Sequence, residues 1–301
     1  MATRNLVKPV YKRQQFLISF IRELDEPLTT TDIQKLLFLY LMSNSLPYYD
    51  FVPYLYGSFS IQASEDIGIL HRMGWLSHYG KRIRYAGSEG VRYLDTYLEG
   101  CIDRISDQLP KARGNELIKL VYEQYPYYAI NSRLASIIMD ADGIVKIKVE
   151  KARLKQSRSV LFTVGYEGIS IEEYLNRLIK NDVHVLCDVR SNPLSRKLGF
   201  SKSSLQKYIS NIGIEYVHLP ELGIKSEKRN NLSSDDDYCN LFADYKSTLS
   251  QYRKSLDDIH RLLQSRGRIA LTCFERDPLH CHRHIIRDYL KETYSVETAD
   301  I

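Results

Sequence analysis

The chain has 301 residues, 44% of them apolar, with 42 Lys plus Arg against 37 Asp plus Glu, which is the composition of a soluble globular protein long enough for two domains. No apolar signal segment opens the sequence and no run approaches the roughly 18 apolar residues of a spanning helix, so we expect no secretion, no membrane partner and a cytoplasmic location. The net charge of +5 is too small to prove a nucleic-acid partner, and only its distribution along the chain can indicate one.

Residues 1–87 have the pattern of a winged helix, which is three helices followed by a hairpin. Helical apolar spacing predicts helices over 14–24, 32–42 and 62–73. Two short alternating runs around Gly80 predict a hairpin over 74–85. The segment resembles the winged-helix-like modules of bacterial regulators and defence proteins, with 54–60 as the recognisable piece. Because the third helix carries only His71 and Arg72 as basic groups, DNA contact and protein contact both stay open for this module.

Residues 88–158 are expected to form a Tyr-rich helical connector that ends in a basic linker. Six cations lie within the last 13 residues, opposed only by Glu150. They are Lys146, Lys148, Lys151, Arg153, Lys155 and Arg158. Such a run is either a solvated linker or a surface that contacts the phosphates of a nucleic acid.

From Ser159 onward strands and helices alternate, which predicts a Rossmann-like domain over 159–301. The expected strands are 160–164, 183–187, 216–219 and 269–273, and the expected helices are 171–180, 205–212, 238–264 and 282–294. Strands rich in Val, Ile and Leu that are separated by helices indicate βαβ units and a parallel sheet covered on both faces. The expected fold class is therefore α/β, with a Rossmann-like parallel-sheet domain after a winged-helix-like and helical N-terminal module.

Polar groups follow each predicted strand of this domain. The segments are Gly165–Gly168, Asp188–Arg190, Pro220–Gly223 and Phe274–Asp277. Because ligands of open parallel sheets bind beyond the carboxyl ends of the strands, we expect these segments to form one site. The Gly165–Gly168 segment lacks the glycine pattern of a dinucleotide site, so no cofactor is expected.

Several motifs of this region together resemble the prokaryotic domain of unknown function 488 family. They are Gly165–Gly168, Asp188–Arg190, Pro193–Arg196, Phe200, Gly213–Gly223, Cys273–Glu275 and Cys281–Arg283, and they follow the family's order over 160–300. The resemblance implies a Rossmann-like domain of mobile or defensive genetic contexts that acts on nucleic acids or nucleotides. Many members have Gly-His-Ser where this chain has Gly165, Tyr166 and Glu167, so any role of that His is absent or altered here.

Carboxylates give the leading hypothesis for the chemistry. Asp188, Glu275 and Glu167 are the predicted catalytic residues, because paired carboxylates can activate a water and stabilise an oxocarbenium-like sugar. Arginines can hold the flanking phosphates, and aromatic rings can stack on an extruded base. The residues predicted to bind substrate are Tyr166, Arg190, Ser195, Arg196, Tyr216, Phe274, His282 and Arg283.

The function expected from these residues is that of a DNA-acting hydrolase. The leading hypothesis is a DNA glycosylase that removes a flipped, modified base in anti-phage defence, with modified phage DNA as its partner. Phosphodiester or nucleotide cleavage would use similar residues, and a nucleotide-sensing DNA-binding regulator is a second class. Asp188 with Arg190, and Glu275 with Arg283, are also candidates for internal ion pairs that only fix loops.

Cysteine chemistry is the main rival to the carboxylates. The five cysteines are odd in number and lie mostly within apolar runs, which favours reduced thiols. Cys281 and Arg287 have the spacing of rhodanese-like and phosphatase loops, but the residues between them include no Gly for an amide cradle. Zinc ligands are also present within 12 residues, namely Cys273, His280, Cys281, His282 and His284. Their spacing matches no zinc finger, and we expect consecutive side chains at a helix start to point apart, so no metal is predicted.

Overall fold

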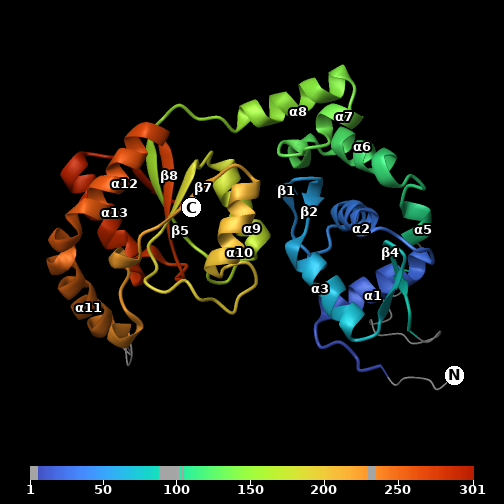
Figure 1. The fold of residues 1–301 in the computed structure, drawn as a ribbon, viewed down its shortest axis with the longest axis horizontal. Coiled ribbons are helices and arrows are strands. Elements are labelled where there is room, and N and C mark those ends of the chain that lie inside the picture. Colours follow the sequence, from blue (N-terminus) through green and yellow to red (C-terminus); the bar gives the residue numbers. More distant parts are fainter. Residues whose placement is uncertain (1–5, 88–99, 101, 103–104, 230–234) are drawn as a thin grey trace. The chain divides into compact units, whose positions relative to one another are not determined.

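The chain folds into two compact units, Met1–Ala152 and Arg153–Ile301 (Figure 1). The structure is a computed structural model that describes residues 6–87, 100, 102, 105–229 and 235–301. The division lies inside the predicted basic linker rather than after it. Part of the predicted connector, 88–99, and Cys101 lie outside the described residues.

The N-terminal unit contains the three predicted helices and the predicted hairpin. Its helices are α1 (Lys12–Leu24), α2 (Thr30–Asn44), α3 (Ile61–Arg72), α5 (Ile105–Gln108), α6 (Gly114–Gln124), α7 (Ala135–Ile138) and α8 (Ala141–Arg153), with the 3-10 turn η1 (Pro126–Ala129). Its strands are β1 (Val52–Tyr54), paired with β2 (Gly57–Phe59), and β3 (Leu76–Tyr79), paired with β4 (Arg82–Tyr85). The β1–β2 hairpin was not predicted, because three residues are too few to show an alternating pattern. The winged-helix assignment and its DNA contact stay predictions.

The basic segment 146–158 differs from the predicted linker, because its first half is helical. Lys146 and Lys148 are exposed on α8, whose Ile147 is buried. The Lys151 ammonium donates to the backbone oxygen of Ile130 at 3.2 Å. The charges of this segment predict a linker, but buried residues such as Ile147 hold one side of α8 against the unit.

The C-terminal unit is a five-stranded parallel sheet, which confirms the predicted α/β class. Its strands are β5 (Val160–Gly165), β6 (Val185–Asp188), β7 (Glu215–His218), β8 (Arg268–Cys273) and β9 (Thr298–Asp300), in the order β7-β6-β8-β5-β9. Its helices are α9 (Ile171–Lys180), α10 (Lys202–Asn211), α11 (Asp235–Thr248), α12 (Arg253–Arg266) and α13 (Arg283–Tyr294), with 3-10 turns η2 (Pro220–Leu222), η3 (Ser226–Arg229), η4 (Leu249–Tyr252) and η5 (Pro278–His280). Strand β9 was not predicted because Thr298, Ala299 and Asp300 form no apolar run.

The helices of this unit cover both faces of the sheet (Figure 1). Helices α11, α12 and α13 pack on one face through a core that includes Leu256, Ile259 and Ile286. Helices α9 and α10 lie on the other face, where the Tyr174 hydroxyl bonds the Thr272 hydroxyl of β8 at 2.8 Å. Strand β8 lies between β5 and β6, and the helices that follow β5 and β8 lie on opposite faces. In α/β folds such a reversal marks the part of the sheet edge, beyond the carboxyl ends of the strands, near which ligands commonly bind.

None of the helices in the described ranges combines the length and the apolar character that a membrane crossing requires.

Buried Lys35 makes the stability of the N-terminal unit depend on pH. Its ammonium donates to the backbone oxygen of Ser58 at 2.6 Å inside the unit. Burial lowers the pKa of Lys35 from 10.5 to about 7. Between these two values the unfolded chain binds more protons than the folded chain, so stability rises with pH.

We expect Lys35→Met to remove this component of the pH dependence. The wild type should gain up to about 1.4 kcal/mol per pH unit from this one group as pH rises above 7, and the variant should not. Urea unfolding of both proteins from pH 7 to about pH 10 measures the difference. The variant should be more stable near pH 7, with a lead that shrinks as pH rises. A lead that is constant across this range would contradict the assignment of a neutralised lysine.

Candidate functional site

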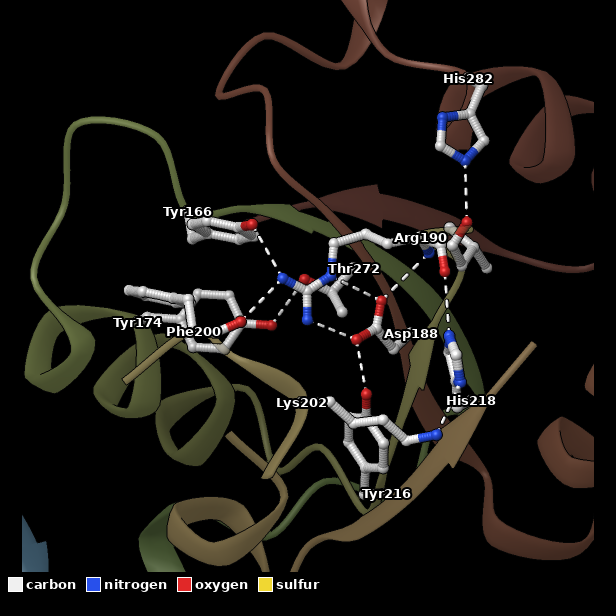
Figure 2. A network of polar contacts seen from close by, with 11 residues as sticks. Tyr166, Tyr174, Asp188, Arg190, Phe200, Lys202, Tyr216, His218, Thr272 and His282 are labelled. Carbon is white, nitrogen blue, oxygen red and sulfur yellow. Dashed lines mark hydrogen bonds and ion pairs between the residues drawn. The ribbon is translucent and has the colours of Figure 1, made fainter. Parts of the chain in front are cut away.

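The predicted catalytic residue Asp188 ends β6 as a buried carboxylate that anchors Arg190 (Figure 2). Its Oδ1 accepts from the Arg190 backbone N–H at 3.1 Å and from Arg190 Nε at 2.8 Å. Its Oδ2 accepts from Arg190 Nη2 at 2.5 Å and from the Tyr216 hydroxyl of β7 at 2.6 Å. A carboxylate offers about four acceptor positions, and these contacts fill them. The internal ion pair weighed from the sequence is therefore present, and Asp188 faces protein groups.

The Arg190 side chain ties two further segments of the chain to this carboxylate. Its Nη1 donates to the Tyr166 hydroxyl at 2.8 Å and to the backbone oxygen of Phe200 at 2.9 Å. Burial opposes the charged guanidinium, but the hydrogen bonds and charge of Asp188 hold the pKa of Arg190 above its ordinary value. The side chain stays charged and serves as an internal clamp. A phosphate contact by Arg190 stays a prediction.

The three aromatic side chains predicted to stack on a base have different surroundings. Tyr166 is buried, and its ring stacks on Phe200 with centroids 4.2 Å apart. Phe274 meets Tyr166 edge-on at 5.3 Å and is 44% exposed. Tyr216 is half-buried, and its hydroxyl is bound to Asp188. Phe274 is thus the ring of this set that offers a face to a ligand.

The loops after β5 and β8 are held against each other, which places Glu167 beside the β8 loop. The backbone N–H groups of Tyr166 and Glu167 both donate to the Phe274 carbonyl, at 3.1 and 2.9 Å. The Glu167 carboxylate accepts from the Arg276 backbone N–H at 3.1 Å. Glu167 is exposed and Glu275 is half-buried, so both predicted catalytic glutamates remain open to solvent.

A glycine and a buried arginine fix the position of the β8 loop. A Cβ on Gly165 would lie 1.9 Å from the Glu275 carbonyl oxygen, so only glycine allows this approach. Arg283 of α13 is buried and donates to the carbonyls of Glu275 and Arg276 and to the Thr163 hydroxyl. Arg283 was predicted to bind substrate, but these contacts make it a support for the loop that carries Glu275.

Basic side chains surround this edge of the sheet. Arg196 is exposed in the loop after β6, and the Ser195 hydroxyl there accepts from the Lys197 backbone N–H at 3.2 Å. Lys197 Nζ donates to the Tyr166 carbonyl at 2.6 Å, and burial lowers the pKa of Lys197.

Lys197, Lys202 and His218 were missed by the sequence analysis. Lys202 Nζ bonds His218 Nδ1 at 2.9 Å, and His218 Nε2 donates to the Arg190 carbonyl at 3.0 Å (Figure 2). Lys197 directly follows the family motif Pro193–Arg196, and His218 lies inside the motif Gly213–Gly223. Their closeness to these motifs is the sequence signal that could have indicated them. Lys202 carries no such signal.

The rhodanese-like alternative finds no support in these contacts. Arg287 forms ion pairs with Asp288 at 2.8 Å and with Asp300 at 2.7 Å. Cys281 is buried, and this burial raises the pKa of its thiol well above the ordinary value. A protonated thiol is a poor nucleophile.

Three of the possible zinc ligands meet, contrary to the expectation that neighbours at a helix start point apart. Cys273, Cys281 and His282 are buried, and their ligand atoms lie within 4.8 Å of one another. Cys281 is extended, with φ −135° and ψ 134°, whereas His282 has helical angles of −54° and −18°. This change of backbone conformation turns the two side chains to the same point. His282, predicted to bind substrate, is thus inside the unit, while His280 is exposed.

A cavity of about 670 Å³ lies beside this cluster, under the loops that follow β6 and β7. Ser191 and Gly223 line one side, and Lys225, Lys228 and Tyr245 line other parts of the wall. The Tyr245 ring also meets the His282 imidazole edge-on at 5.6 Å. The wall of the cavity therefore touches the buried cluster.

We expect Asp188→Asn to destabilise the C-terminal unit by about 3–5 kcal/mol, because it leaves the buried Arg190 guanidinium without its counter-charge. Tyr216→Phe, which removes one hydrogen bond to the same carboxylate, should cost about 1 kcal/mol. Denaturant unfolding measures both, with Glu292→Gln at the exposed end of α13 as the control. An Asp188→Asn variant as stable as the wild type would show that the pair does not hold this edge together.

Comparisons with known proteins identify the family of the C-terminal unit. Residues 170–290 match the family described as Domain of unknown function DUF488. No curated protein and no solved structure matches the chain significantly. The matched residues contain β6, β7, β8 and most of α13, together with Asp188, Arg190 and Glu275, whereas Tyr166 and Glu167 precede them. The C-terminal unit of this chain therefore contains a DUF488 domain, as the motifs of its sequence predicted.

Proposed function

We propose that the C-terminal unit is a DNA-acting hydrolase, a glycosylase that cleaves the N-glycosidic bond of an extruded base. The observation that carries this proposal is an exposed aromatic residue in the loops that carry two carboxylates at the carboxyl edge of the sheet. Phe274 is 44% exposed, and Glu275 follows it in the chain. The backbone N–H of Glu167 donates a hydrogen bond to the Phe274 carbonyl. A base taken out of the stack needs a ring to lie on and a carboxylate near its sugar.

The two glutamates supply the chemistry in this proposal. As the bond between C1′ and the base nitrogen breaks, its electron pair leaves with the base and positive charge develops on the sugar. One carboxylate stabilises this charge, and the other accepts a proton from the water that attacks C1′. That proton then passes to the nitrogen of the departing base, so the products are the abasic sugar and the neutral base. Glu275 is the leading candidate for one of these roles, because the Gly165 contact and Arg283 fix its backbone.

Asp188 has a different role in the proposal from the one predicted from the sequence. Its acceptor positions are filled by Arg190 and Tyr216, so it acts as a positioning residue for the edge. Arg196, Lys197 and Lys202 supply positive charge for the DNA backbone around that edge. A modified base, such as those of phage DNA, is the proposed target, in a role in anti-phage defence.

Glu275→Gln should lower the rate of base release by about 100-fold or more, because a neutral amide neither takes a proton nor stabilises the sugar cation. The assay incubates the full chain with plain and base-modified oligonucleotides and then detects abasic sites by alkaline cleavage. Glu292→Gln, an exposed and distant change of the same chemistry, should act as the wild type does. Strand breaks that form without alkali would show that the enzyme cleaves the phosphodiester bond and not the N-glycosidic bond. Absence of any product from plain and from modified DNA would reject the proposal.

The exposed lysines of α8 are expected to contribute to DNA affinity. Reversing Lys146 and Lys148 to Glu should weaken binding to all sequences alike and lower the log-log salt slope by about 0.7 to 0.9 for each lost contact. The double reversal of Lys254 on α12 and Lys291 on α13, both exposed, is the matched control for the change in charge. Binding isotherms at several salt concentrations give both quantities, and parallel slopes with equal affinities would mean that α8 does not contact phosphates.

The cavity beside β6 and β7 supports a second candidate function, a sensor of a nucleotide. Its volume of about 670 Å³ lies within the range of small-molecule sites, and Lys225 can bind phosphate there. Lys228 lines the same wall but is paired with Asp244 at 3.0 Å. The sensor predicts that a nucleoside triphosphate raises the melting temperature in a saturable way and that Lys225→Ala removes this rise. Such a result, together with no turnover of DNA, would favour the sensor over the hydrolase.

A further inference from the structure

Two thiols and an imidazole meet inside the C-terminal unit at a point that the proposed chemistry does not use. Cys273 ends β8, Cys281 follows η5, and His282 directly precedes α13. His282 Nδ1 lies 3.8 Å from Cys273 Sγ and 3.8 Å from Cys281 Sγ. All three residues are buried, so the cluster is shielded from bulk water.

The hydrogen bond on the far side of the imidazole fixes its tautomer. His282 Nε2 lies 3.1 Å from the backbone oxygen of Val189. A carbonyl oxygen can only accept, so Nε2 carries the hydrogen and Nδ1 carries a lone pair in the neutral ring. That lone pair is on the nitrogen that lies near both sulfurs. Metal-binding histidines are commonly oriented in this way by a partner of their second nitrogen.

The distances agree with those around a tetrahedral zinc ion. With Zn–S bonds of about 2.3 Å and a Zn–N bond of about 2.0–2.1 Å, a tetrahedral angle puts sulfur and nitrogen about 3.6 Å apart. The two observed distances are each 3.8 Å. The two sulfurs lie within 4.8 Å of each other, and two thiolates of one tetrahedral zinc ion would lie about 3.8 Å apart, so side-chain adjustments of up to about 1 Å would complete the coordination.

We propose that Cys273, Cys281 and His282 bind a zinc ion. Two thiolates and a neutral imidazole are the soft and borderline ligands that zinc prefers. Two thiolates also balance the charge of the ion, so the bound cluster adds no net charge to the interior. This inference does not rest on the proposed glycosylase activity.

Three protein ligands leave a fourth coordination position for a water molecule. The Glu275 carboxylate accepts from Cys273 Sγ at 3.4 Å, but it lies outside the group of ligand atoms within 4.8 Å of one another, so it is a neighbour of one ligand rather than the fourth ligand. A zinc ion here would join the end of β8 to the start of α13 and, through His282 and Val189, to the end of β6.

The charges around the thiols also suit a metal site. Burial raises the pKa of the Cys281 thiol, and the positive charge of the buried Arg283 acts in the opposite direction and favours its thiolate. Zinc is bound by thiolates, so its binding releases protons from the cysteines that hold it.

Metal content and cobalt spectroscopy of the full chain test the proposal. The protein is expected to hold about one zinc ion per chain, released by a chelator under reducing conditions. Cobalt added to the stripped protein should give the visible bands of a tetrahedral site and a thiolate charge-transfer band in the near ultraviolet. Cys273→Ser and His282→Gln should each weaken zinc binding at least about 10-fold.

Cys187→Ser is the matched control, because Cys187 is an equally buried thiol at the end of β6 outside the cluster. It should keep the full metal content. Stripped wild type that stays folded by circular dichroism, yet gives no thiolate band with cobalt and takes up no zinc, would overturn the proposal without any variant. Loss of two thiols from the reduced wild type in air, with no metal bound, would overturn it in favour of a Cys273–Cys281 disulfide.

Discussion

The buried ion pair between Asp188 and Arg190 is the interaction on which the candidate site depends. A charged pair inside a protein is favourable only when its hydrogen bonds are completed, and Tyr216, Tyr166 and the Phe200 carbonyl complete them. Through these contacts the pair connects the ends of β5, β6 and β7. The more exposed glutamates then take their positions from loops that this arrangement holds in place.

The sheet could be predicted from the sequence because strands that are buried in a parallel sheet consist of consecutive apolar residues. Strands β5, β6 and β8 and helix α9 follow from such runs and from amphipathic spacing, and Ser170 caps α9 as its sequence position suggests. Strand β9 and the β1–β2 hairpin could not be predicted, because three-residue strands are held by pairing with distant residues. Two domains were expected from the length, but the place of the boundary between them and the helix α8 depend on packing that a charge run does not reveal.

The location of the candidate site could be predicted from the sequence, but the roles of its individual residues could not. The rule that ligands bind beyond the carboxyl ends of strands locates Asp188 and Glu275. This rule does not predict that the Asp188 carboxylate accepts hydrogen bonds from Arg190, because such contacts depend on the directions of the side chains. The same limit explains Cys281 and His282, whose convergence depends on a local change from extended to helical backbone. Zinc at this point would place a metal next to Glu275, so the two proposals meet at one carboxylate and remain separable by experiment.

The central claim is that the glutamates at this edge stabilise positive charge on a sugar of DNA. Its most direct test compares the affinity of the full chain for two DNA duplexes, one with a cationic pyrrolidine in place of a nucleoside and one with a neutral tetrahydrofuran of the same shape. Because transition-state mimics bind about 100-fold or more tightly than ground-state mimics, the cationic duplex should bind far better, and Glu275→Gln should remove most of that advantage. Equal affinity of the wild type for both duplexes would contradict the account.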